Sequence, residues 1–159
     1  MEQYFYKLNA ADNLSFLQTE IYKKDGWFNK NSFDILEVPL VKFGNHSLFK
    51  LILKFNGKPL ILKMDPMYWY NWHTDIGIRQ CSINSFLEGP DSRCFFGKKE
   101  TNDLFKLTEL SYEPNRYYLF NTQESHAVLN GNNVRYILSI GFKNITYQDL
   151  LTYCKDNNL

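Results

Sequence analysis

Residues 125–142 read SHAVLNGNNVRYILSIGF, two apolar runs on either side of a polar cluster at 130–133. Val, Ile, Tyr and Phe favour strands, and Asn and Gly between two such runs indicate a turn. We therefore expect strands over 125–129 and 135–142, joined by a two-residue hairpin at Gly131-Asn132. Such a hairpin predicts that the end of the chain belongs to an antiparallel sheet.

The register of this hairpin places four side chains on one face of the sheet. With Gly131-Asn132 at the turn, Val128 faces Arg135 and His126 faces Ile137. Side chains alternate across a strand, so all four point the same way. Arg135 is then the diagonal neighbour of His126, at a Cα separation of about 7–8 Å. A register shift of one residue would turn Arg135 to the opposite face.

Further strand-like runs fill the middle of the chain. Pro39 places the run 36–43 at a sheet edge or a bulge. Asn56-Gly57 lies between the runs 48–55 and 59–64 and is the strongest hairpin signal in the chain. The remaining strands are expected over 79–87, 105–112 and 117–121.

Helical signals occur near the two ends. Asp12 is expected to cap a helix that Gly26 ends, with apolar residues at helical spacing between them (Leu14, Leu17 and Ile21). A short closing helix is expected around Tyr147, Leu150, Leu151 and Cys154. Many short strands with helices only at the edges predict a mainly β fold, either a sandwich or a jelly-roll barrel. We expect a single domain over residues 1–159, with core strands at about 36–143.

Charge and cysteine content narrow the classes of protein to consider. A formal net charge of +1 gives no electrostatic footprint for nucleic acid or an anionic membrane, so neither is expected as a partner. The three widely spaced cysteines match neither a disulfide framework nor a zinc finger. No signal peptide or membrane-spanning run is evident, and we expect a cytoplasmic protein.

A candidate metal site begins at His73-Thr74-Asp75. His73 and Asp75 are two residues apart, so on extended backbone both side chains point to one face. His126 would add a second imidazole from another strand. Two histidines and one carboxylate on one face of an octahedron are the ligand set of non-haem Fe(II) oxygenases, which leaves three positions open. The alternative is that His73 and Asp75 form only a local hydrogen-bonded pair in a loop.

Arg135 stands in an otherwise apolar strand, where an inward charge is costly unless it meets an anion. A guanidinium binds a carboxylate through two parallel hydrogen bonds and stays charged when buried. Its expected distance from His126 suits a dicarboxylate that binds iron at one end and Arg135 at the other. A structural acid elsewhere in the chain is the alternative partner.

Three stretches resemble the 2-oxoglutarate/Fe(II)-dependent oxygenase superfamily: HTDIGIRQCSIN at 73–84, FNTQESHAV at 120–128 and RYILSIGF at 135–142. In particular, they look like small bacterial and viral members related to aspartyl/asparaginyl β-hydroxylases. The resemblance covers roughly residues 60–143. It implies a double-stranded β-helix, with His73 and Asp75 at the mouth of an early strand and His126 and Arg135 on the last two core strands.

The resemblance also implies an activity. Fe(II) would be held by His73, Asp75 and His126, and 2-oxoglutarate would be the cosubstrate, with Arg135 on its distal carboxylate. Reaction with O₂ would release succinate and CO₂ and hydroxylate the substrate. The family further suggests cosubstrate contacts for three more residues, Asn84, Ser139 and Arg79. A strand Asn that satisfies nearby backbone, and an Arg at the surface, are the alternatives for the first and last of these.

Two features depart from the family. Many members carry Ser or Thr two residues after the anchoring Arg, but here that position is Ile137, and Ser139 is the next inward position. The second contact to the distal carboxylate is therefore unassigned. The best-known animal β-hydroxylases lack the carboxylate ligand, whereas Asp75 is present here, so their substrate does not transfer. We expect an Asp, Asn or Pro side chain in a protein or peptide, then a free amino acid or other small metabolite; the weak charge disfavours a nucleobase.

Two other interpretations stay open at the level of sequence. A cupin-type metalloprotein that does not use 2-oxoglutarate would keep the metal ligands and give Arg135 a structural role. A non-enzymatic jelly-roll binding module would make His73 and Asp75 incidental. The aromatic cluster before the motif either lines a substrate entrance or belongs to the core (Tyr68, Trp69, Tyr70 and Trp72).

Overall fold

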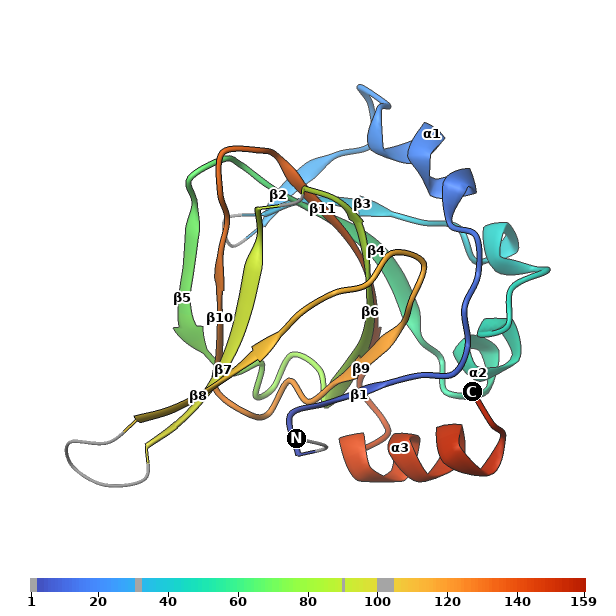
Figure 1. The fold of residues 1–159 in the computed structure, drawn as a ribbon. Coiled ribbons are helices and arrows are strands. Elements are labelled where there is room, and N and C mark those ends of the chain that lie inside the picture. Colours follow the sequence, from blue (N-terminus) through green and yellow to red (C-terminus); the bar gives the residue numbers. More distant parts are fainter. Residues whose placement is uncertain (1–2, 31–32, 90, 100–104) are drawn as a thin grey trace.

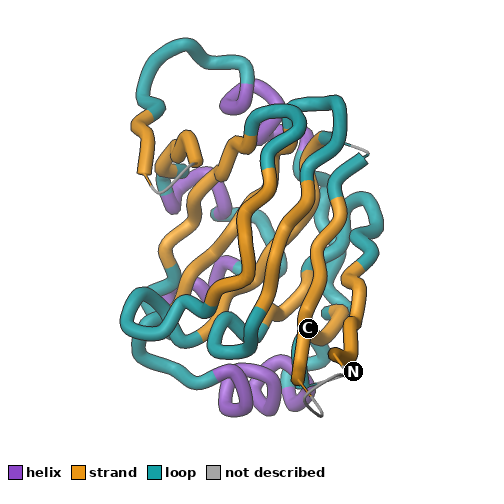
Figure 2. The backbone as a smooth tube through the Cα atoms, turned by 90° about the vertical axis from the view of Figure 1, so that its left-hand side faces the viewer, coloured by secondary structure: helices purple, strands orange, loops and turns teal. Residues whose placement is uncertain are grey.

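The computed structural model describes residues 3–30, 33–89, 91–99 and 105–159, which form two antiparallel sheets that face one another (Figure 1). The larger sheet has seven strands in the order β1 (Phe5–Lys7), β9 (Tyr118–Phe120), β6 (Cys81–Glu88), β11 (Arg135–Phe142), β4 (Lys58–Met64), β3 (Phe33–Glu37) and β2 (Phe28–Lys30). The smaller sheet has four strands in the order β5 (Trp69–His73), β10 (His126–Leu129), β7 (Arg93–Lys99) and β8 (Phe105–Leu110). Figure 2 shows the strands running alongside one another when the molecule is turned by 90°.

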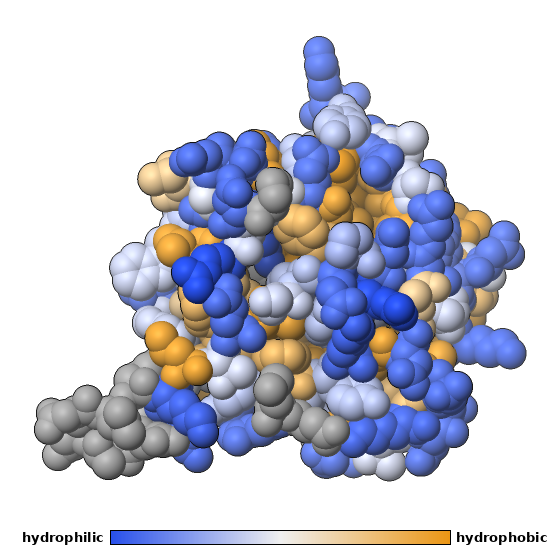
Figure 3. All heavy atoms as spheres, in the orientation of Figure 1, coloured by the Kyte–Doolittle hydropathy of each residue, from blue (hydrophilic) through white to orange (hydrophobic). Residues whose placement is uncertain are grey.

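The two faces of the larger sheet have different neighbours. Its outer face packs against the helices and a large apolar cluster, which includes Ile61, Leu119, Leu138 and Ile140. Its inner face looks across to the smaller sheet, where a second cluster of mainly aromatic residues joins the two sheets at one side. Hydrophilic side chains cover much of the face in Figure 3, and apolar ones show between them near its middle. The strand alternation thus separates a packed outer face from an inner face that is free to line a cavity.

The predicted mainly β fold is confirmed, and several strands form close to their expected ranges. The run 135–142 is strand β11, and 59–64 is strand β4 with one further residue at its start. Two strands lie wholly before the expected core range of 36–143. They are β1, which pairs with β9, and β2, which pairs with β3. No residue range was predicted for β5 or β7, although the family resemblance implied an early strand with His73 and Asp75 at its mouth, which is β5.

The hairpin expected at Asn56-Gly57 is wrong. The run 48–55 forms helix α2 (Phe49–Lys54), because Leu48, Leu51 and Ile52 are buried at helical spacing against the core. Asn56 has a φ of 51°, and the Gly57 N–H donates to the Ile52 carbonyl at 2.8 Å, so the pair ends a helix.

The hairpin expected between 125–129 and 135–142 is also wrong. Strand β10 pairs with β5 and β7, whereas β11 pairs with β4 and β6 in the other sheet. The polar cluster carries the chain from one sheet to the other. The Asn130 side-chain amide donates to the carbonyls of Met64, Asp65 and Asn133, at 3.3, 2.7 and 2.8 Å. These bonds satisfy three backbone carbonyls at the place where the chain passes between the two sheets, after β4 and again before β11.

The N-terminal helix is much shorter than expected. It consists of a 3₁₀ turn, η1 (Ser15–Leu17), and one α-helical turn, α1 (Gln18–Ile21). Asp12 does not cap it, because its carboxylate accepts hydrogen bonds from Ser47 and from the Tyr117 hydroxyl. The expected strand at 36–43 is the end of β3 followed, after Pro39, by a second 3₁₀ turn, η2 (Leu40–Phe43).

The closing helix is α3 (Tyr147–Asp156), with its apolar residues buried as expected. Thr146 caps it, since its hydroxyl accepts from the Asp149 N–H. Figure 1 shows α3 below the sheets. None of the helices in the described part of the chain is long and apolar enough to cross a bilayer.

Candidate metal centre

His73 and His126 are brought together by strand pairing. His73 is the last residue of β5 and His126 the first of β10, and the two are register partners in that antiparallel pair. Their ring centroids are 4.1 Å apart. Asp75 was expected on extended backbone, but it lies two residues beyond the end of β5. Its N–H donates to the Thr122 carbonyl at 2.8 Å. One potential ligand atom from each of the three side chains lies within 4.8 Å of the others.

Backbone carbonyls orient both imidazole rings. The Nδ1 atom of His73 is 2.7 Å from the Asn71 carbonyl, and that of His126 is 2.8 Å from the Glu124 carbonyl. A carbonyl only accepts, so each Nδ1 donates a hydrogen, and Nε2 is the ring nitrogen left to bind a metal. Burial, together with the neighbouring His73, lowers the pKa of His126 to about 4. The His126 ring is therefore neutral at neutral pH, as a metal ligand must be.

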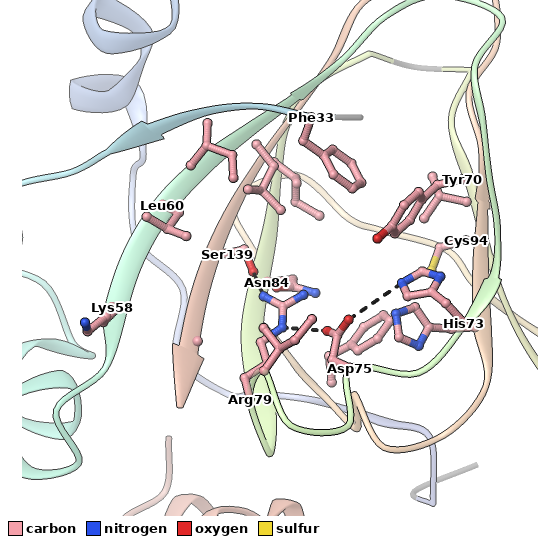
Figure 4. A pocket seen from close by; sticks show the side chains of 18 of the residues that line it. Phe33, Lys58, Leu60, Tyr70, His73, Asp75, Arg79, Asn84, Cys94 and Ser139 are labelled. Atoms are coloured by element: carbon pink, nitrogen blue, oxygen red, sulfur yellow. Dashed lines mark hydrogen bonds and ion pairs between the residues drawn. The ribbon is translucent and has the colours of Figure 1, made fainter. Parts of the chain in front are cut away.

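The two oxygens of Asp75 have different neighbours (Figure 4). Arg79 Nε donates to Oδ2 at 2.7 Å, whereas Oδ1 lies 3.7 Å from His73 Nε2. Arg79 also donates through Nη1 to the Ser139 hydroxyl at 2.9 Å. Arg79 and Ser139, both expected to contact the cosubstrate, thus bond to each other and, through Arg79, to Asp75. Asp75 is only 6% exposed, and the guanidinium supplies the charge that its burial requires.

The centre opens into a cavity of about 440 Å³ between the two sheets. Its walls include the inner faces of β3, β4 and β11 on one side and residues of β5, β7 and β10 on the other. Figure 4 shows Leu60 across the cavity from His73, and the Phe33 and Tyr70 rings meet edge to face with their centroids 4.6 Å apart. Of the aromatic cluster before the motif, Tyr70 lines the cavity, whereas Trp69 and Trp72 are exposed.

Arg135 lines the same cavity although it is only 3% exposed. Its Nε atom has no hydrogen-bond partner among the described residues. The ion pairs of the described part of the chain do not include Arg135 either. A buried guanidinium without a counter-charge is costly, so this end of the cavity is suited to an anion.

Three residues near Arg135 complete this end of the cavity. Asn84 is buried, and its Oδ1 also lacks a partner among the described residues. Tyr112 also lines the cavity, and burial raises its pKa. Tyr112 and Cys94 were missed in the sequence. Tyr112 ends a predicted strand and looked like any other strand aromatic, and the strand that carries Cys94 was not predicted.

Two solved structures share this architecture. A prolyl-4-hydroxylase from Pseudomonas putida superposes with a TM-score of 0.60 at 13% identity, over 89% of this chain and 92% of that one. An oxidoreductase of the 2OG-Fe(II) oxygenase family from Burkholderia pseudomallei gives 0.64 at 12% identity, over 91% and 86%. The chain has the double-stranded β-helix fold. The fold implied by the family resemblance is therefore confirmed.

The sequence itself matches no family model and no curated protein. At identities of 12–13% the likeness establishes the fold and leaves the chemistry to be argued from the site. The relation to aspartyl/asparaginyl β-hydroxylases stays a prediction.

Proposed function

We propose that this protein is an Fe(II)- and 2-oxoglutarate-dependent oxygenase. Its substrate would be an amino-acid side chain in a protein or peptide, or a small metabolite, and succinate and CO₂ would be released. One observation carries the proposal: two imidazoles and a carboxylate converge in a cavity that also holds a buried guanidinium, whose Nε has no hydrogen-bond partner among the described residues. A metal centre and a separate anion site in one cavity are what a chelating dicarboxylate requires.

The donor set fits Fe(II). His73 and His126 would each offer Nε2, and Asp75 would offer Oδ1, because Arg79 already occupies Oδ2. Two imidazoles and one carboxylate leave room for a bidentate cosubstrate and O₂. When bound, the iron supplies the oxidative chemistry, and the protein supplies the ligand geometry around it.

Arg135 would bind the distal carboxylate of 2-oxoglutarate at the buried end of the cavity. Asn84 and Tyr112 lie beside it and are the polar groups available for the second contact that the sequence left unassigned. Ser139 accepts from Arg79, so its own hydroxyl hydrogen is available to a bound carboxylate. Apolar residues such as Leu62 and Ile137 form the wall between these polar groups.

Anaerobic titration with Fe(II), followed by an assay of succinate formation, tests the proposal. We expect saturable metal binding that is lost in His126→Ala and retained in His46→Ala, the histidine outside the cavity. We also expect O₂-dependent conversion of 2-oxoglutarate to succinate. Metal binding that is indifferent to His126→Ala would contradict the proposed centre. Metal binding without any succinate would instead favour a cupin-type metalloprotein.

A further inference from the structure

Two lysines lie at the opposite end of the cavity from Arg135. Lys58 begins β4, and Lys143 directly follows β11. Both line the cavity, and Lys58 lies beside the end of β11 because it is the register partner of Gly141. Lys58 shares the inner face of β4 with Leu60 (Figure 4). Both lysines are exposed residues that contribute to the lining of the cavity.

Neither lysine takes part in an ion pair within the described part of the chain. Lys63, on the same strand as Lys58, instead contacts Asp34 at 3.0 Å. Asp149 lies in a surface hollow that Lys143 also lines, but its carboxylate accepts from the Thr146 hydroxyl at 2.7 Å. The two ammonium groups are thus available to a ligand.

The charge of the cavity is strongly one-sided. Its lining contains four cationic side chains, Lys58, Arg79, Arg135 and Lys143, and one carboxylate, Asp75. Asp75 is already paired with Arg79. Cations gathered in a cavity with apolar walls raise the local concentration of anions.

A single small anion cannot reach both ends. Arg135 and Gly141, the partner of Lys58, are six positions apart on β11, and at the rise of a strand this is roughly 20 Å. The lysines therefore form an anion site distinct from the one at Arg135. On the two strands that join these ends, the cavity lining is largely apolar and includes Leu60, Leu62 and Ile137.

We propose that the substrate is a small organic acid. Its apolar body would pack against the apolar wall of the cavity, and its carboxylate, or a comparable anionic group, would bind Lys58 and Lys143. The inference rests on the proposed function, whose substrate class it specifies. A volume of about 440 Å³ suits a small molecule, since such sites generally hold roughly 300–1,000 Å³.

Binding to the metal-free protein tests the inference without any turnover. The probes are 4-phenylbutyrate and its neutral amide, compared by calorimetric titration. We expect the acid to bind more tightly than the amide. The Lys58→Glu/Lys143→Glu variant should weaken acid binding about tenfold and leave the amide unaffected. The control is Lys24→Glu/Lys50→Glu, which changes the net charge equally at exposed positions outside the cavity and should bind like the unaltered protein.

Arg135→Gln separates the two anion sites, and it should retain acid binding. Equal affinities for acid and amide would overturn the inference, as would a loss in Arg135→Gln that the lysine variant does not share. The charge-neutral variant Lys58→Gln/Lys143→Gln, examined by thermal melting, checks that the loss of acid binding is not a folding defect.

A titration with 4-phenylbutylphosphonate, compared with 4-phenylbutyrate, shows whether the lysines prefer a phosphate-type group or a carboxylate. The proposed function is tested separately, because a negative result for acid binding leaves the outcome of the metal-binding and succinate assays open.

Discussion

Asp75 is held from both its backbone and its side chain. Its N–H donates to the Thr122 carbonyl, and its Oδ2 accepts from Arg79. Arg79 is itself fixed, because Gln123 Nε2 donates to its carbonyl at 2.6 Å and its Nη1 reaches Ser139 on β11. One guanidinium thus ties the carboxylate to the larger sheet. We infer that Arg79 positions Asp75 as a metal ligand.

Replacing Arg79 should weaken metal binding without abolishing it. Partners of metal ligands typically contribute about 10–100-fold in affinity, so we expect a loss of that order in Arg79→Met and partial recovery in Arg79→Lys. Anaerobic titration with Fe(II) measures both. Arg93→Met is the matched control, because Arg93 pairs with Glu109 on the exposed face. Unchanged affinity in Arg79→Met would show that Asp75 needs no such support.

Arg135 allows a test that separates function from architecture. Its buried, unpartnered Nε weakens the fold, so Arg135→Met should raise the free energy of unfolding of the metal-free protein by about 1–3 kcal/mol. The same change should strongly raise the concentration of 2-oxoglutarate that half-maximal succinate formation requires, and leave the affinity for Fe(II) unchanged. Urea unfolding and succinate assays provide the two measurements. Loss of stability together with loss of metal binding would assign Arg135 a structural role.

At the scale of elements, Gly57 lets the chain after helix α2 pass close to strand β11. A Cβ at this position would lie 2.6 Å from the Phe142 ring and 3.0 Å from Ile140. We therefore expect Gly57→Ala to lower the free energy of unfolding by about 1–3 kcal/mol in urea unfolding. Gly44→Ala is the control, because its Cβ would meet only the Val41 carbonyl, at 3.5 Å. Equal effects of the two substitutions would contradict the steric argument.

Local patterns predicted β11 and α3 because the signals for them lie within their own residues. The run 48–55 misled because a short apolar run fits a strand or a buried helix, and packing against the core decides between them. The partner of β10 could not be read from the chain, since sheet assignment depends on contacts remote in sequence. His73, Asp75, His126 and Arg135 nevertheless line one cavity, because β10 and β11 face each other across it.

At the scale of the whole molecule, the three buried cysteines make the stability of the fold depend on pH. Cys81, Cys94 and Cys154 are buried and free, and burial raises the pKa of each thiol to about 12. Their ordinary value is 9.0. Between pH 9 and pH 12 the thiols are largely deprotonated in the unfolded chain but still protonated in the folded chain. The stability that the neutral thiols provide is therefore complete below pH 9 and declines as the pH rises toward 12.

Urea unfolding at several pH values under reducing conditions should show this decline. Each thiol contributes a slope of up to about 1.4 kcal/mol per pH unit above pH 9. Cys81→Ala/Cys154→Ala should flatten the alkaline slope, whatever it does to stability at pH 7, because alanine does not titrate. Buried tyrosines, Tyr117 among them, have raised pKa values and will leave part of the slope in the variant. An unchanged slope in the variant would mean that these two thiols reach solvent in the folded protein, and so that the packing beneath α3 is looser than the structure has it.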